Sequence, residues 1–312
     1  MNDQHVNTTA EVRVTKVKVP SGGLNLVCDL YEPVGTPPAA GYPGLVIGHG
    51  FSFIKEGLVN QGHFFARQGY VTLAIDYRTF GESEGEPRGQ LFPLNEVEDY
   101  RNSISWLENR DNVDAARIGI WGTSFGGAVV IYTAAMDTRV KAVVSQVPVV
   151  NGRAWLRSLR SPDQWEELLD AIVEDRRRRF RGEPSRRIKV TGMARHGDEA
   201  VMPADKEINE FLDNARSALK TWCDTLTLES AEKVIEFDPS SVIHLISPRP
   251  LRIVTAAGYD IIHPLDQIND AYRKANEPKD LVLLPFRQLD MYTQPKQDVG
   301  LQHALDWFDR WL

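Results

Sequence analysis

The residues best suited to chemistry in this chain are the serine and glycines of the segment Gly-Thr-Ser-Phe-Gly-Gly at positions 122–127. The apolar run 117–121 precedes the segment and the run 128–132 follows it, which predicts a strand, a very tight turn and a helix. Glycines beside Ser124 permit such a turn, and the start of the helix offers N–H groups to a developing anion. Ser124 is therefore the candidate nucleophile, although a glycine-rich turn that only packs a helix on a sheet would look similar.

The elements around this turn follow the pattern of an α/β protein. Apolar and polar residues alternate over residues 12–19 and 24–31, on either side of a Ser-Gly-Gly turn, which predicts an antiparallel hairpin. Continuously apolar runs typical of buried parallel strands occupy residues 44–47 and 70–75. The alternation of helix and strand continues through a helix at 58–68, a helix at 94–108 and a strand at 140–147. These patterns predict a doubly wound, mostly parallel sheet with an N-terminal antiparallel hairpin.

The middle of the chain has a different character. Between residues 151 and 243 we expect mixed helical segments and no regular strands, whereas strand patterns resume at 251–256 and 281–284. We therefore predict a core made of residues 1–150 and 244–312 and an inserted helical lid, 151–243, above the carboxyl ends of the strands, where α/β sheets bind ligands. The arginine run 176–179 follows Glu174 and Asp175, which favours a solvated helix face over an anion-binding cluster.

Composition narrows the range of partners. A chain of 312 residues, 42% hydrophobic and 25% charged, can bury the core of such a domain, and its net charge of −7 gives no electrostatic reason to bind nucleic acid or an anionic membrane. Cys28 and Cys223 lack metal or disulfide spacing, so we expect free thiols, no metal and no cofactor. The absence of a signal-like N-terminus and of a long apolar run predicts a cytoplasmic protein. A small molecule is the expected partner, and a homodimer is suggested by analogy alone.

Four segments together resemble the α/β-hydrolase superfamily, specifically its dienelactone-hydrolase-like and peptidase-like branch, which includes polyketide-tailoring hydrolases and acyltransferases. They are Gly48-His49-Gly50-Phe51 with Lys55-Glu56, residues 76–83, the Ser124 turn, and Gly258-Tyr259-Asp260 with Pro264. The resemblance implies an α/β-hydrolase fold and an oxyanion hole made by the backbone N–H groups of Phe51 and Phe125. It also implies that His49 shapes the oxyanion turn, and that Asp76 and Arg78 fix loops without taking part in the chemistry.

The resemblance further implies a triad in the chain order nucleophile, acid, histidine. Asp260, after the strand predicted at 251–256, takes the position of the acid, although an aspartate there would also suit an Asx turn before the next helix. The third position departs from the family pattern, because Gln288 stands where the resemblance places the histidine. A carboxamide has no basic nitrogen and cannot accept the proton of Ser124.

Gln288 leaves three explanations open. It is an introduced substitution, or a natural residue in an enzyme whose chemistry needs no serine–histidine relay, or a sign that another group has become the base. Among the seven histidines, His263 is the strongest substitute base because it follows Asp260 by three residues on a loop that should border the pocket. The others are His5, His49, His63, His196, His244 and His303.

The leading hypothesis is an enzyme acting on the ester, thioester or lactone carbonyl of a medium-sized apolar metabolite, with water or an alcohol as acceptor. Ser124 attacks, the amides of Phe51 and Phe125 hold the oxyanion, and Asp260 orients the base. One alternative is a non-hydrolytic enzyme, for cyclisation, condensation or elimination, on the same scaffold. The other is a ligand-binding homologue that has lost turnover.

Overall fold

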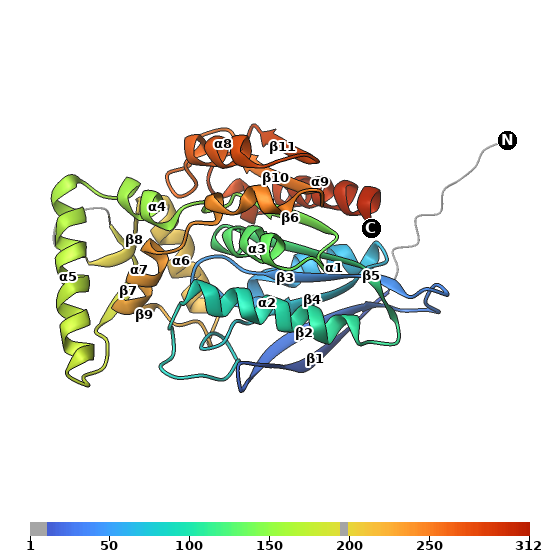
Figure 1. Ribbon diagram of the computed structural model, residues 1–312, viewed down its shortest axis with the longest axis horizontal. Helices are drawn as coiled ribbons and strands as arrows, with labels where there is room; N and C mark the ends of the chain where they lie inside the picture. The colour runs from blue at the N-terminus through green and yellow to red at the C-terminus, as the bar shows by residue number, and fades with distance from the viewer. Residues whose placement is uncertain (1–10, 194–198) are drawn as a thin grey trace.

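An eight-stranded sheet forms the centre of the computed structural model, which describes residues 11–193 and 199–312 (Figure 1). The strand order is β1-β2-β4-β3-β5-β6-β10-β11. Strands β1 (Val12–Ser21) and β2 (Leu24–Pro33) form an antiparallel hairpin, β2 pairs antiparallel with β4 (Val71–Ile75), and the other neighbours are parallel. The remaining strands are β3 (Tyr42–Gly48), β5 (Val113–Thr123), β6 (Ala142–Gln146), β10 (Leu251–Ala256) and β11 (Lys279–Leu284). The doubly wound, mostly parallel sheet predicted from the sequence is thus confirmed.

Helices cover both faces of this sheet. Helices α1 (Val59–Arg67) and α9 (Lys296–Trp311) pack on one face, whereas α2 (Pro93–Glu108), α3 (Phe125–Met136) and α8 (Leu265–Lys274) pack on the other. The central strand β5 serves both layers, because Ile120 belongs to the α2–α3 core and Trp121 to the α1–α9 core. This double burial explains why the central strands are apolar at consecutive positions.

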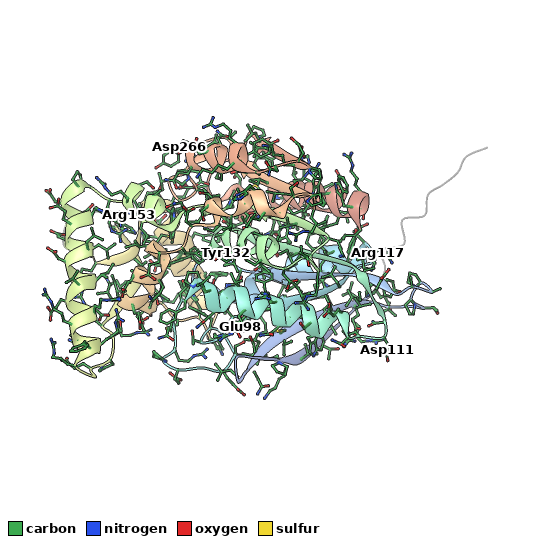
Figure 2. The ribbon with its side chains drawn as sticks, in the orientation of Figure 1. Glu98, Asp111, Arg117, Tyr132, Arg153 and Asp266 are labelled. Atoms are coloured by element: carbon green, nitrogen blue, oxygen red, sulfur yellow. The ribbon has the colours of Figure 1, made fainter. Side chains whose placement is uncertain are left out.

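The carboxyl ends of the parallel strands point toward the lid. Figure 2 shows Arg117, near the middle of β5, toward one end of the molecule and Arg153 of the lid at the other. The chain therefore runs along β5 toward the lid and reaches Ser124 where the strand ends. The short helices η1 (Lys55–Leu58), η2 (Pro239–Ser241), η3 (Ile243–Ile246) and η4 (Asp290–Tyr292) lie in the loops and connections.

The lid, defined as residues 151–243, is not purely helical. It contains a separate sheet of three described strands in the order β8-β7-β9, namely β7 (Arg187–Met193), β8 (Ala200–Ala204) and β9 (Thr225–Thr227). Around it lie α4 (Gly152–Ser158), α5 (Pro162–Phe180), α6 (Lys206–Ala218) and α7 (Leu228–Ile235). The prediction of a helical lid without strands was therefore wrong. β9 is three residues long and pairs with β7 across the intervening β8 and α6, so local periodicity carried little signal for it.

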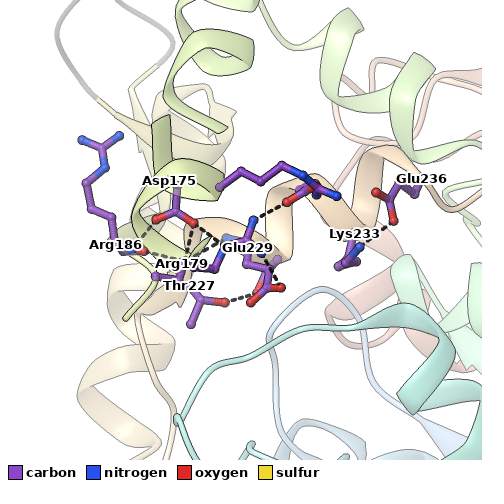
Figure 3. A network of polar contacts seen from close by, with 11 residues as sticks. Asp175, Arg179, Arg186, Thr227, Glu229, Lys233 and Glu236 are labelled. Atoms are coloured by element: carbon purple, nitrogen blue, oxygen red, sulfur yellow. Dashed lines mark hydrogen bonds and ion pairs between the residues drawn. The ribbon is translucent and has the colours of Figure 1, made fainter. Parts of the chain in front are cut away.

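The arginine run 176–179 makes ion pairs inside the lid. Arg179 binds Asp175 on its own helix at 3.0 Å and Glu229 of α7 at 2.8 Å, and it also contacts Glu232 (Figure 3). Arg176 contacts the same Glu232. Arg176 and Arg179 thus join α5 to α7. The side chains of Arg176 and Arg177 are largely exposed, as in the predicted solvated helix face, whereas that of Arg179 is mostly buried.

Three further observations concern the described part of the chain only. Within it, no helix is long and apolar enough to cross a bilayer. No group of three or more histidine, cysteine or acidic side chains among residues 11–193 and 199–312 is placed to hold a metal ion. Cys28 and Cys223 are free thiols.

Candidate active site

Ser124 sits at a sharp turn between β5 and α3. Its backbone has φ 56° and ψ −119°, a conformation that side-chain-bearing residues rarely adopt. The flanking glycines are required by close packing: a Cβ on Gly122 would lie 2.2 Å from the carbonyl oxygen of Gly126, and one on Gly126 would lie 2.3 Å from that of His49. The glycine spacing therefore allows the turn that presents the serine at the end of the sheet.

His263 is the group that lies against Ser124. Its Nε2 is 3.0 Å from the Ser124 Oγ, and its Nδ1 is 2.8 Å from the Oδ2 of Asp260. With Nδ1 protonated and donating to Asp260, Nε2 is unprotonated and can accept the serine proton. The hydroxyl of Tyr292 also lies 3.3 Å from this nitrogen. Asp260 also accepts hydrogen bonds from the N–H groups of Ile262 and His263 through Oδ1, both at 2.9 Å. The Asx-turn and acid interpretations of this residue are therefore compatible.

Gln288 lines the same cavity as Ser124 and His263. Among the described contacts it makes no hydrogen bond to Ser124. Its Nε2 donates to the Oδ2 of Asp205 at 2.9 Å and to the Oε2 of Glu207 at 2.8 Å, both on the lid. The placement of Gln288 as the third triad member is corrected by this geometry: the imidazole beside the serine comes from the β10–α8 loop, and not from the loop after β11.

The other histidines among the described residues are not placed to act as a base on Ser124. His63, His244 and His303 do not line the cavity that contains the serine. His49 lines it, but its Nδ1 donates to the carbonyl oxygen of Gly50 at 3.0 Å, and burial lowers the pKa of His49 to about 4. His5 and His196 lie outside the described residues.

The two residues predicted to form the oxyanion hole, Phe51 and Phe125, lie on segments that approach each other beside Ser124. Phe125 is the first residue of α3, so its N–H has no acceptor within the helix. Phe51 lies on the facing loop, where a Cβ on the preceding Gly50 would already lie 3.0 Å from the Cβ of Ser124. The rings of Phe51 and Phe125 pack edge to face with centroids 5.5 Å apart, which fixes the two loops against each other.

Charged side chains fix the segment that follows Phe51. The Oδ1 of Asp76 accepts the backbone N–H of Lys55 at 2.7 Å, and the Lys55 ammonium binds Glu82 at 2.8 Å. Burial raises the pKa of Asp76 to about 6, although the nearby ammonium of Lys55 acts in the opposite direction. Arg78 binds the buried Asp99 through Nη2 at 2.6 Å. Asp76 and Arg78 thus make contacts of the loop-fixing kind that the resemblance implies, and Lys55, for which no role was predicted, joins them through Asp76 and Glu82.

An apolar cavity of about 330 Å³ opens beside Ser124. One wall is the apolar stripe of the lid helix α6, in the spacing of one helix face: Ile208, Phe211, Leu212, Ala215, Ala218 and the adjoining Leu219. Among the described residues that line the cavity, none is Asp, Glu, Lys or Arg. A wider hollow of about 730 Å³ lies beside α2 and contains none of Ser124, Asp260 and His263. The candidate reactive residues and the apolar cavity therefore coincide beneath the lid.

Two lid tryptophans hold the loops that carry the reactive groups. Trp155 donates its indole N–H to the carbonyl oxygen of Ile262 at 2.7 Å, next to His263. Trp222 donates to the carbonyl oxygen of Ser52 at 2.8 Å, next to Phe51. Sequence reasoning placed both residues in the lid without a role, because nothing in their local sequence identifies partners 107 and 170 positions away.

The fold and this arrangement define an α/β hydrolase. The model of the X-Pro dipeptidyl-peptidase (S15) family matches residues 6–286, and the chain belongs to that family. The crystal structure of the α/β hydrolase GrgF from Penicillium sp. sh18 superposes with a TM-score of 0.79 at 24% identity, covering 96% of this chain and 98% of that one. The superfamily resemblance read from the sequence is thus confirmed.

Sequence relatives of nearly full length have hydrolase and transferase names. The chain is 29% identical over 289 residues to the thiohydrolase aneE of Aspergillus aculeatus, covering 89% of this chain and 85% of that protein. It is 28% identical over 278 residues to the polyketide transferase ATR5 of Stachybotrys chlorohalonatus, covering 86% and 89%. These relatives and the family support a hydrolase-type enzyme.

Proposed function

We propose that the protein is a serine acyl hydrolase or acyltransferase that uses Ser124, His263 and Asp260. The observation that carries the proposal is the pair of hydrogen-bond distances 3.0 Å (Ser124 to His263) and 2.8 Å (His263 to Asp260) at the mouth of an apolar cavity. Nucleophile, base and orienting acid in this geometry are the arrangement that acyl transfer requires.

The proposed reaction proceeds through an acyl-enzyme. The Ser124 Oγ attacks the substrate carbonyl while its proton passes to the Nε2 of His263, and the carbonyl oxygen becomes an oxyanion held by the N–H groups of Phe51 and Phe125. Collapse of this intermediate breaks the bond to the alcohol or thiol, which leaves with the proton of His263. Water or a second alcohol then attacks the acyl carbon while its proton passes to His263. Collapse of this second oxyanion breaks the bond to the Ser124 Oγ, which takes the proton back from His263.

The lining of the cavity favours a neutral, apolar acyl group. A peptide with a charged amino terminus would need a carboxylate counterion, and none is found among the described lining residues. The stripe of α6 instead offers aliphatic and aromatic contacts to an alkyl or polyketide-like chain. Thiohydrolases and polyketide transferases among the relatives agree with an ester or thioester of this kind.

The non-hydrolytic and non-catalytic alternatives depended on the missing base. Because His263 lies within hydrogen-bond distance of Ser124, Gln288 gives no reason to prefer either of them. The choice between water and an alcohol as acceptor depends on the second substrate, so both acceptors belong in the test.

The first test measures Ser124→Ala and His263→Ala against the parent protein with p-nitrophenyl and thioester substrates of increasing chain length, in water and with added alcohols. We expect each substitution to lower kcat by about four to six decades, because each removes a member of one relay. Labelling by a fluorophosphonate should require Ser124 and should be strongly slowed in His263→Ala.

Gln288→His serves as the discriminating control. If residue 288 were the vacant position of the base, a histidine there would increase turnover by several decades. We expect no gain, since His263 already accepts the proton. Full activity in His263→Ala, or a large gain in Gln288→His, would contradict the proposed relay.

A further inference from the structure

Gln288 is a fully buried carboxamide that contacts two parts of the molecule at once. On the lid side, its amide nitrogen donates to Asp205, the N-cap of α6, and to Glu207 in the first turn of that helix. On the core side, the Oε1 of Gln288 accepts the backbone N–H of Ile261 at 3.5 Å, and the backbone N–H of Gln288 donates to the carbonyl oxygen of Tyr259 at 2.9 Å. Tyr259 and Ile261 flank Asp260 directly.

The chemistry of these contacts suits an amide and not a neutral imidazole. A carboxamide offers two N–H donors and one acceptor oxygen, and Gln288 directs the donors to two carboxylates and the oxygen to Ile261. A neutral histidine has one donor and could not serve both acids. The residue type found here is therefore explained by its contacts.

These contacts hold the start of α6, and α6 forms one wall of the cavity. Asp205 and Glu207 stand at the start of α6, and the following turns of this helix supply the apolar stripe beside Ser124. Asp205 also caps the helix, because its Oδ1 accepts the N–H of Ile208 at 3.0 Å, and it accepts the Tyr259 hydroxyl at 3.2 Å. One buried side chain thus links the position of the acyl wall to that of the loop carrying Asp260 and His263.

We propose that Gln288 is a positioning residue that latches the lid helix α6 onto the β10–α8 loop through Asp205 and Glu207. The latch sets the width of the acyl cavity next to the triad and so favours long acyl chains over short ones. The proposal rests on the proposed acyl-transfer function for its activity readout, whereas its structural readout is independent of any reaction.

Four titratable groups face this latch in the described contacts. They are Asp205, Glu207, the guanidinium of Arg287, which lies 3.5 Å from Glu207, and the hydroxyl of Tyr259, which donates to Asp205. The guanidinium of Arg287 also lies 5.7 Å from the centre of the Tyr259 ring. A new carboxylate at position 288 would therefore meet two acids, with one exposed cation nearby.

The decisive variant is Gln288→Glu, which keeps the shape of the side chain but replaces the donating NH₂ with a carboxylate. Above the pKa of the new group, three carboxylates meet and α6 should detach, whereas at acidic pH the protonated acid can donate to one of the two acids again. Hydrogen exchange of residues 206–218, expressed as the ratio of variant to parent, should be clearly raised at pH 8 and much closer to one, although still above it, at pH 5. The ratio of kcat/KM for p-nitrophenyl octanoate to that for the acetate should fall about tenfold at pH 8, mainly through KM.

Three further variants make the result unambiguous. Gln302→Glu is the matched control, because Gln302 donates to Asp306 at 2.8 Å on the exposed face of α9, and its exchange ratio over 206–218 should stay at one. Glu207→Ala removes one acceptor without adding charge and should raise the ratio at every pH. Gln288→Glu combined with Glu207→Gln exchanges amide and acid, and should partly restore protection of α6.

The outcomes separate the two proposals. Unchanged exchange of 206–218 in both Gln288→Glu and Glu207→Ala would overturn the latch, and so would an effect of Gln288→Glu that does not vary with pH. Raised exchange in the variants, together with a parent protein that shows neither fluorophosphonate labelling nor turnover, would support the latch and overturn the proposed function. Normal turnover of the parent, together with unchanged exchange and an unchanged octanoate-to-acetate ratio in Gln288→Glu, would support the proposed function and overturn the latch.

Discussion

At the scale of single residues, Asp260 combines two tasks that are often divided between residues. Its Oδ1 binds two N–H groups of its own loop, and its Oδ2 binds the imidazole three positions later. The acid and the base thus belong to one short turn, so the geometry of the pair is set locally and only its distance from Ser124 depends on the fold.

This double role predicts different results for two substitutions. Asp260→Asn can keep the loop bonds through its side-chain oxygen but loses the charge that holds Nδ1 protonated, so kcat should fall by about three to four decades with little change in Tm. Asp260→Ala should lose similar activity and also stability, by about 1–3 kcal/mol, because two buried N–H groups lose their acceptor. Steady-state kinetics and thermal unfolding of both proteins provide the check. Equal destabilisation by the two substitutions would contradict the loop-fixing role.

At the scale of elements, the lid does more than cover the cavity. Trp155 and Trp222 reach from the lid to the loop carrying His263 and to the loop carrying Phe51, so the two halves of the site are positioned by one inserted unit.

Removing one of these hydrogen bonds should affect activity more than stability alone explains. Trp155→Phe keeps a buried ring but loses the donor to Ile262, and we expect kcat to fall about five- to tenfold because His263 is less well held. Trp307→Phe is the control, since Trp307 is also buried and its indole N–H has no partner among the described residues. In urea unfolding Trp155→Phe should lose more stability than Trp307→Phe, because only Trp155→Phe leaves a buried carbonyl oxygen without its donor. A similar loss of kcat in the control would argue against the bracing role.

At the scale of the whole molecule, buried titratable groups near the loop that carries Phe51 contribute to the response of stability to pH. The folded-state pKa of His49 is lowered to about 4 from an ordinary value of 6.5, because burial disfavours its charged form. Between these values the unfolded chain binds more protons than the folded one, so stability is fully present above pH 6.5 and declines as pH falls toward 4. The contribution of Asp76 to stability changes with pH in the opposite direction, because its folded-state pKa is raised to about 6 and the folded chain therefore binds more protons below that value.

A difference measurement isolates the contribution of His49. His49→Asn retains a donor for the carbonyl oxygen of Gly50 but cannot titrate in this range. We expect the variant to be less stable than the parent at pH 7, with the gap narrowing by up to about 3 kcal/mol between pH 6.5 and 4. Urea unfolding at several pH values measures it, and a gap that is constant with pH would show that His49 does not contribute to acid sensitivity.

The sequence by itself determined the parts of this protein that are encoded locally. The turn at Ser124 follows from glycines within two residues of it, the hairpin from alternation within two adjacent segments, and the central sheet from runs of residues buried on both faces. The resemblance added the loops of Phe51 and Asp260, because those motifs are continuous in the chain.

Only the tertiary structure decided which side chain meets Ser124. His263 is 139 positions away, and the pairing of β5, β6 and β10 side by side in one sheet brings its loop to the serine. Motif position alone favoured residue 288. The strands of the lid and the contacts of Trp155, Trp222 and Gln288 were hidden for the same reason. Periodicity reports which face of an element is buried, but the partner across a long-range contact depends on how distant elements pack.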